Sequence, residues 1–218
     1  IKVWELGNEL ENYAIIQPCE MRDDGTQYPC AWGPAGGMGP LDYFGPRWAK
    51  VSAVLKGLSD GVHAGDPSAL RAIGTAGWGH SGAFDRLAAD KIGWDISVWH
   101  QYERGQDVQL AHIASFGKPI WITEFNHPNG SRDGEDAQAR GVAAMMQDYR
   151  DRRARYRIEA AFVYELFDEP YWDGYEASMG LVRQEKNARG SWRPAKPKPA
   201  YDAISDALAA RRTGSAPP

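Results

Sequence analysis

Short apolar runs alternate with amphipathic stretches along this chain. The runs are a few residues long and rich in Val, Ile and Trp, which is typical of buried β-strands. They lie at residues 2–9, 70–75, 94–99, 119–126 and 158–167. Each run is followed by a segment with the three- and four-residue apolar spacing of a helix. These segments lie at residues 46–58, 84–89, 107–116, 135–153 and 201–211.

Strict alternation of strand and helix predicts an α/β fold with a parallel sheet and right-handed crossovers. Five strand–helix units are three fewer than the eight of a closed (β/α)8 barrel. The first strand begins almost at Ile1, without an initiator Met. We therefore expect residues 1–212 to be the carboxyl-terminal portion of a barrel, with the amino-terminal half as a partner. Residues 213–218, rich in small residues and Pro, are expected to form a disordered tail.

Two glutamates lie at the ends of predicted strands. Glu9 ends the run at residues 2–9, and Glu124 lies near the end of the run at residues 119–126. The carboxyl ends of barrel strands are where α/β barrels build their active sites. Two carboxylates there suit acid/base or covalent chemistry on a polar substrate. One such Glu is common, but one strand ending Asn-Glu and another ending Thr-Glu-Phe make a more specific pattern.

The composition narrows the class of partner. The chain is 43% hydrophobic and 25% charged, which is ordinary for a soluble globular domain. A net charge of −4 does not favour nucleic acid, and no apolar stretch is long enough to span a membrane. Nine Trp and ten Tyr against six Phe supply flat rings with polar edges, which suit sugar rings. Packing in the core is the alternative role of these aromatic residues.

Cys19 and Cys30 lie in a long loop, residues 10–45, that is rich in Gly and Pro. A disulfide within this loop is expected and implies an oxidising compartment, hence a secreted or periplasmic protein. Two free thiols are the alternative. A loop of this length typically shapes a binding cleft. Two Cys are too few for a zinc site and no His pair has metal-ligand spacing, so we expect neither a metal nor a cofactor.

Three segments resemble clan A glycoside hydrolases, most closely families five and thirty-nine. Trp-Glu-Leu-Gly-Asn-Glu at residues 4–9 resembles the fourth barrel strand, whose acid/base Glu follows an Asn. His-Gln-Tyr at residues 100–102 resembles the end of the sixth strand, and Trp-Ile-Thr-Glu-Phe at residues 121–125 resembles the seventh. The resemblance covers nearly the whole chain. It implies a (β/α)8 barrel of which this chain supplies strands four to eight.

The resemblance also implies a reaction. It suggests a retaining glycoside hydrolase that cleaves β-glycosidic bonds in a polysaccharide or oligosaccharide, with Glu9 as acid/base and Glu124 as nucleophile. Asn8 would bind the sugar hydroxyl next to the anomeric carbon, and Tyr102 would orient Glu124. His100 would contact sugar hydroxyls or Glu9. Further candidates for substrate binding lie at or just beyond strand ends: Trp78, His80 and Tyr164.

Two departures from the clan pattern and several alternatives are part of this hypothesis. Many clan members place a Trp on strand eight where this chain has Tyr164 or Glu165. The groups that the clan places on strands one to three have no counterpart in this sequence. An exo-acting β-glycosidase is one alternative, and a non-catalytic carbohydrate-binding barrel is another. The presence of both Glu residues argues against the binding barrel. A metal-dependent hydrolase lacks the paired ligand spacing it would need.

Overall fold

The computed structural model describes residues 1–213, and the side chains of residues 1–209. The predicted disordered tail therefore lies, apart from Thr213, outside the described residues. The strands are β1 Val3–Glu5, β2 Leu70–Thr75, β3 Ile96–Gln101, β4 Ile120–Phe125, β5 Ile158–Val163, β6 Val182–Lys186 and β7 Trp192–Pro197. The α-helices are α1 Gly45–Gly65, α2 Ala83–Ala89, α3 Asp107–Ala114, α4 Glu135–Tyr156 and α5 Pro199–Thr213.

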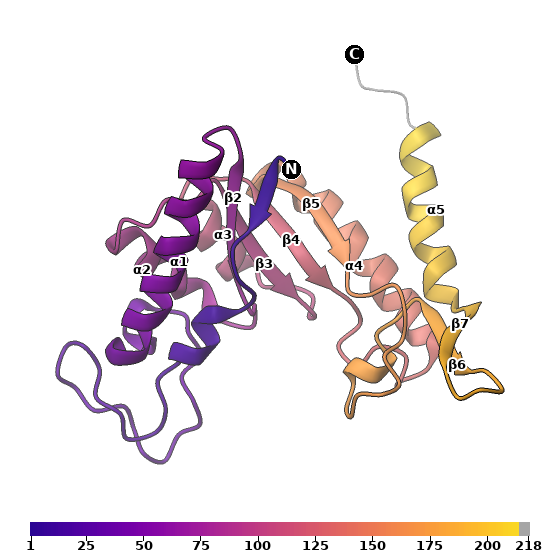
Figure 1. The fold of residues 1–218 in the computed structure, drawn as a ribbon, viewed down its shortest axis with the longest axis horizontal. Helices are drawn as coiled ribbons and strands as arrows, with labels where there is room; N and C mark the ends of the chain where they lie inside the picture. The colour runs from indigo at the N-terminus through magenta and orange to yellow at the C-terminus, as the bar shows by residue number, and fades with distance from the viewer. Residues whose placement is uncertain (214–218) are drawn as a thin grey trace. The chain divides into compact units, whose positions relative to one another are not determined.

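Strands β1 to β5 form one sheet in the order of the chain, β1-β2-β3-β4-β5 (Figure 1). The registers described for β1 with β2 and for β2 with β3 are parallel, with Val3 opposite Leu70 and Ala72 opposite Ile96. A helix follows each of the first four strands, and it returns the chain to the end of the sheet at which the previous strand began. Each new strand can therefore run parallel to the one before it. The predicted α/β architecture of a partial barrel is confirmed.

The chain divides into two compact units. The first comprises Ile1–Gln101, Gly105–Ile122 and Ala154–Ala160, and the second comprises Tyr102–Arg104, Thr123–Arg153 and the chain from Ala161 onward. In the first unit every residue of β3 is buried, which makes this strand the centre of the core. Helix α1 covers the core with side chains at three- and four-residue spacing. These side chains are Trp48, Val51, Leu55 and Ser59.

Two of the boundaries that differ from those expected concern candidate site residues. Strand β1 ends at Glu5, because Gly7 turns the chain with a φ of +80°, a backbone angle that favours glycine. Glu9 is therefore beyond the strand, at the start of a 3-10 helix, Leu10–Ala14, rather than at the strand's last position. Strand β5 ends at Val163, which places Tyr164 and Glu165 in the loop that follows.

The antiparallel hairpin of β6 and β7 was not predicted. Strand β6 (Val-Arg-Gln-Glu-Lys) has one apolar residue and β7 (Trp-Arg-Pro-Ala-Lys-Pro) carries two prolines, so neither shows a period-two alternation of apolar and polar residues. The turn between them is closed by Asn187, whose side chain accepts hydrogen bonds from the backbone of Arg189 and Ser191. Between β5 and the predicted helix at residues 201–211 the chain therefore forms a hairpin, and α5 follows it.

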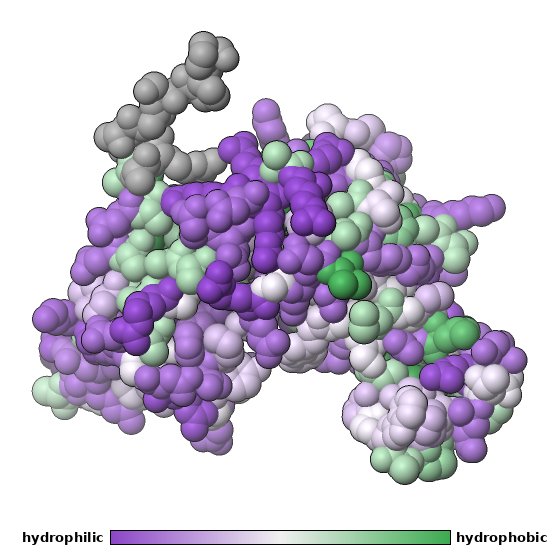
Figure 2. Space-filling view, turned by 180° about the vertical axis from the view of Figure 1, so that it is seen from behind, coloured by the Kyte–Doolittle hydropathy of each residue, from purple (hydrophilic) through white to green (hydrophobic). Residues whose placement is uncertain are grey.

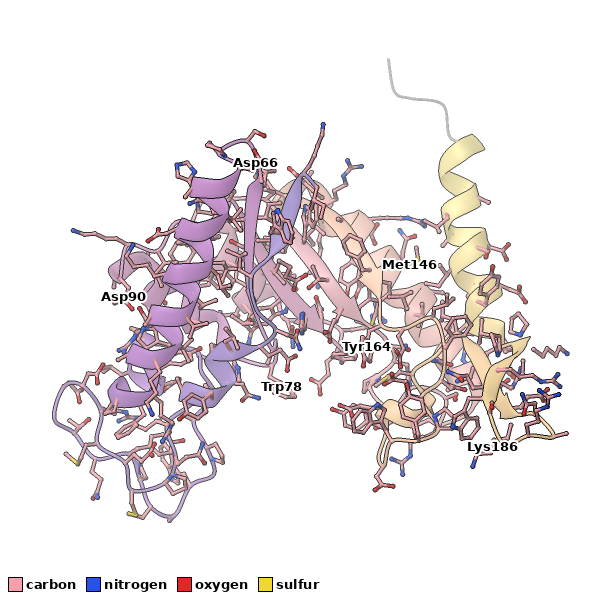
Figure 3. The ribbon with its side chains drawn as sticks, in the orientation of Figure 1. Asp66, Trp78, Asp90, Met146, Tyr164 and Lys186 are labelled. Carbon is pink, nitrogen blue, oxygen red and sulfur yellow. A yellow bond between two sulfur atoms is a disulfide. The ribbon has the colours of Figure 1, made fainter. Side chains whose placement is uncertain are left out.

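A groove lies between β1, at the edge of the sheet, and helix α1. Its volume is about 660 Å³, and Trp4 and Leu58 line it with 45% and 41% of their surfaces exposed. The groove ends near Asp66, which Figure 3 labels where α1 ends. Gly57 and Gly61 are one helical turn apart on the α1 wall, and each faces open space where a Cβ would stand. The wall is therefore low enough for another backbone to approach closely.

The surface carries hydrophilic and hydrophobic residues side by side. On the face shown in Figure 2, hydrophobic residues form small spots that are separated by hydrophilic surface. None of the helices within residues 1–213 combines the length and the apolar composition that crossing a bilayer requires.

Candidate active site

Glu9 belongs to the first unit and contacts a buried histidine. The residue has a left-handed backbone, with a φ of 50°, and begins the 3-10 helix at Leu10–Ala14. Its Oε1 lies 2.7 Å from Nδ1 of His100, whose side chain is only 2% exposed. Of the two contacts expected for His100, the structure contains the one with Glu9. His100 lies in β3, the most buried strand, so its ring is held in place. The contact with this ring therefore restricts the position of the Glu9 carboxyl group.

The turn after β2 keeps His100 in place. Gly77 has a φ of +80°, and a Cβ at this position would stand 1.9 Å from the carbonyl oxygen of His100. Only glycine allows both the backbone angle and this close approach. The turn therefore packs directly against the backbone of the residue that contacts Glu9.

The other candidates of the first unit differ in exposure. Asn8 is exposed beside Glu9, and Trp78 is 54% exposed just beyond β2, where Figure 3 labels it. Both side chains are accessible to a ligand. His80, predicted to contact substrate, is only 5% exposed, and its Nδ1 lies 2.9 Å from Oε1 of Glu11. The structure thus gives His80 a partner inside the protein rather than an open place beside a ligand.

Glu124 belongs to the second unit and contacts a tyrosine. The hydroxyl of Tyr102 donates a hydrogen bond of 2.7 Å to Oε2 of Glu124, which lies in β4. A hydroxyl that donates to a carboxylate favours its ionised form and fixes its orientation. The structure thus contains the contact by which Tyr102 was expected to orient Glu124.

Asn126, which sequence reasoning did not single out, fixes the end of β4. It is fully buried, and its Nδ2 donates to the carbonyl oxygens of Tyr164 and Met179. Its Oδ1 accepts from the backbone N–H of His127 and from the side chain of Gln138. A buried amide with all these partners ties the end of β4 to the loop that follows β5. An Asn two residues after a predicted nucleophile was the only sequence signal for this role.

Tyr164 and Glu165 occupy the loop that follows β5 in an acidic environment. Burial raises the pKa of the Tyr164 hydroxyl, and the nearby charge of Glu165 raises it further. Burial also raises the pKa of Glu165 to about 7, with added repulsion from Glu169, Asp168, Glu176 and Glu124. Oε1 of Glu165 is buried and has no hydrogen-bond partner among the described residues. Near neutral pH this carboxyl group is therefore partly protonated.

Glu165 should make the stability of the protein fall as the pH rises. Its folded-state pKa lies above the ordinary value of 4.5, so the folded state binds more protons than the unfolded state between pH 4.5 and about 7. The destabilisation is absent below the unfolded pKa and complete above the folded one. Glu165→Gln should raise the free energy of unfolding at pH 8 by about 1 kcal/mol, a value reduced for solvent screening. At pH 4 it should change little.

Chemical denaturation at both pH values measures this effect. Glu185→Gln is a suitable control, because Glu185 is exposed in β6. An equal gain at pH 4 and pH 8 for Glu165→Gln would contradict the role of its charge.

The side-chain types of the candidate residues do not by themselves exclude a metal. Glu9, His100 and Glu124 are all side chains that a divalent cation accepts as ligands. The expectation of a metal-free reaction therefore stays a prediction, which treatment with a chelator tests. In the loop before α1, Cys19 and Cys30 are joined by a disulfide bond.

Comparison with known proteins gives a fold but no sequence family. No protein-family model matches this sequence, and no curated protein matches it. Solved structures do match. The GH53 catalytic domain of Ignisphaera aggregans has a TM-score of 0.53 at 14% identity over 83% of this chain. A GH10 xylanase from Bispora sp. MEY-1 has a TM-score of 0.51 at 17% identity over 90%. Xylanase 10B from Thermotoga maritima has a TM-score of 0.50 at 15% identity over 97%.

These matches cover only part of the solved chains. The present chain spans 54% of the first, 62% of the second and 61% of the third. At 14 to 18% identity the likeness concerns the fold and not the residues that act. The resemblance to clan A glycoside hydrolases therefore holds at the level of the fold. This chain has the fold of part of a (β/α)8 barrel, and it shares that fold with solved glycoside hydrolases.

Proposed function

We propose that this protein is a retaining glycoside hydrolase that cleaves β-glycosidic bonds in a polysaccharide or oligosaccharide. Glu9 is the acid/base and Glu124 is the nucleophile. The observation that carries the proposal is the 2.7 Å hydrogen bond from Tyr102 to Glu124, because it fixes the direction in which the Glu124 carboxyl group points. The fold shared with solved glycoside hydrolases supports the same reading.

The proposed reaction has two steps. In the first, a carboxylate oxygen of Glu124 attacks the anomeric carbon while Glu9 gives its proton to the departing glycosidic oxygen. The C–O bond to the leaving group breaks, and a glycosyl ester on Glu124 forms. In the second, Glu9 takes a proton from water as the water attacks the anomeric carbon and releases Glu124. His100, within hydrogen-bond distance of Glu9, keeps this carboxyl group in place through both transfers.

Exposed side chains supply the substrate contacts in this proposal. Asn8 bonds the hydroxyl beside the anomeric carbon, and Trp78 offers a ring face to a neighbouring sugar. Tyr164 takes the place that a Trp holds in many clan members. The disulfide between Cys19 and Cys30 supports secretion or export to the periplasm, since such bonds persist in oxidising compartments.

The decisive measurement is the separation of the Glu9 and Glu124 carboxyl groups in a crystal structure with a bound inhibitor. Retaining enzymes place these groups ~5–5.5 Å apart, and inverting enzymes place them ~6.5–9.5 Å apart with a water between them. The proposal requires the shorter distance. A separation in the inverting range would exclude a glycosyl ester on Glu124, and a longer one would exclude any shared reaction.

The partner proposed for this chain is the remainder of a barrel, which would be received at the groove between β1 and α1. Strand β1 lies at the edge of the sheet, beside the apolar groove wall formed by α1. A further parallel strand could pair with β1, and the helix of that strand could pack in the groove. The solved barrels that match have chain length beyond the matched part.

An open groove should make the isolated chain self-associate at high concentration. Trp4→Lys places a charge in the groove and should reduce that association. Trp32→Lys is the matched control, because Trp32 is 61% exposed in a loop that does not line the groove. Sedimentation velocity over a range of concentrations measures the effect. If both variants associate like the parent chain, the groove is not the contact surface.

A further inference from the structure

Glu11 is a buried acid two residues beyond Glu9, and the proposed reaction does not use it. It is 2% exposed, and its Oε1 accepts the backbone N–H of Ala76 at 2.7 Å. The same oxygen lies 2.9 Å from Nδ1 of His80. Its Oε2 is buried and has no hydrogen-bond partner among the described residues. One carboxyl oxygen of Glu11 therefore has hydrogen-bond partners, and the other has none among the described residues.

Such a group is costly for folding. A buried carboxylate oxygen without a partner loses its hydration and gains no bond in return. Similar sites in proteins are often more stable with an apolar side chain. Glu11 and Ala14 are the buried residues of this short 3-10 helix. The contacts of Glu11 with Ala76 and His80 are therefore the ones to consider for a role beyond stability.

The contacts of Glu11 tie the Glu9 segment to the turn after β2. Ala76 precedes Gly77, whose Cα lies against the backbone of His100, and His100 contacts Glu9. The two carboxyl groups are thus linked through one short ring of contacts. Glu9 has a left-handed conformation, and its side chain makes no capping hydrogen bond to its own 3-10 helix. Its carbonyl oxygen accepts the backbone N–H of Asn12. A shift of Glu11 would therefore move Glu9 by two routes. One is the backbone between the two residues, and the other is the set of contacts through the turn after β2 and His100.

His80 gives Glu11 a rigid partner. The hydroxyl of Tyr43 lies 3.0 Å from the carbonyl oxygen of His80 and 2.9 Å from that of Gly37. Tyr43 is fully buried, and a Cβ on Gly37 would stand 2.6 Å from the His80 ring. The His80 ring therefore cannot follow Glu11 if that side chain moves.

We propose that Glu11, held by Ala76 and His80, is a positioning residue that fixes the Glu9 carboxyl group against His100. It does not touch substrate and exchanges no proton with it. The catalytic consequence rests on the proposed function, whereas the positioning itself does not.

Glu11→Gln is the principal test, with two readouts. The first is the ¹⁵N spectrum of the His100 ring, in which hydrogen bonding at Nδ1 has a distinct signal. The variant should lose or shift that signal, whether or not the protein hydrolyses glycosides. The second is kcat on aryl glycosides with poor and good leaving groups. A misplaced acid should lower kcat about 10- to 100-fold for the poor leaving group and much less for the good one.

Two further variants complete the test. Glu20→Gln removes a charge from the same loop by breaking the ion pair with Arg47, and it should change neither readout. His80→Gln keeps the bond between Glu11 and Ala76, so it should act in the same direction as Glu11→Gln but less strongly, and it serves if Glu11→Gln does not fold. An unchanged His100 spectrum in Glu11→Gln, or an equal fall in kcat for both leaving groups, would overturn the proposal. Absence of hydrolysis in the parent chain would count against the proposed function alone.

Discussion

Glu124→Ala is expected to lower kcat for glycoside hydrolysis by roughly 10³-fold or more, since removing a nucleophile abolishes the covalent step. Binding of the sugar should survive, because the exposed residues that would contact it are unchanged. The loss should therefore appear in kcat and not in KM. Steady-state kinetics on an aryl glycoside, with calorimetric binding of the product sugar, separates the two quantities.

A small anion sharpens this test. Azide can occupy the space that the carboxylate leaves and attack the anomeric carbon in its place, so it should restore turnover and yield a glycosyl azide. Glu159→Ala is the matched control, since Glu159 is exposed in β5 and lies 3.9 Å from Arg157. It should leave kcat unchanged. Normal activity of Glu124→Ala would end the assignment of Glu124 as nucleophile.

Lys198→Met should produce the largest loss of stability, about 3–5 kcal/mol in the free energy of unfolding. The Lys198 side chain is 2% exposed, and its ammonium group lies 2.5 Å from Asp168 and 2.9 Å from the hydroxyl of Ser131. Methionine fills a similar volume but leaves Asp168 buried without its cation. Urea denaturation at pH 7 measures the change.

The pH separates lost charge from lost packing in Lys198→Met. Burial already raises the pKa of Asp168 in the presence of Lys198. Without the cation, the deficit should grow as the pH rises through that pKa and shrink in acid, where Asp168 is neutral. Lys196→Met, at an exposed position in β7, should stay within about 0.5 kcal/mol of the parent. A deficit of equal size at pH 4 and pH 8 would identify packing as its cause.

The parallel sheet could be predicted because its strands carry their signal locally. Leu70–Thr75 forms a strand with the predicted bounds, since its apolar residues are flanked by polar segments. The first strand was predicted too long because apolar pattern alone does not reveal that Gly7 adopts a positive φ. The hairpin of β6 and β7 was missed because most of its residues are exposed and its strands lack an apolar–polar alternation. The pattern of apolar and polar residues therefore predicts strands and helices that bury one side against the core. It misses elements that are exposed on most of their surface.

The candidate site shows the same limit. Glu9 and Glu124 could be proposed as candidates because each lies at or near the end of an apolar run, and Tyr102 because it follows the strand β3. Glu11 could not, because its partner Ala76 is 65 positions away in the sequence and only the fold brings the two together. Asn126 was passed over because an Asn after a strand is usually a turn residue. Side chains that support a site through partners distant in the sequence cannot be recognised from the residues next to them in the chain.

The disulfide bond between Cys19 and Cys30 makes the structure of the protein depend on the redox conditions under which it is produced. It closes a ring of about a dozen residues inside a loop, and a ring of that size removes about 3 kcal/mol of chain entropy from the open state. Neither cysteine lies in a strand of the sheet. Protein made without oxidation would thus keep its sheet while this loop frays. Two batches with identical helix and strand content could then differ in the conformation of this loop.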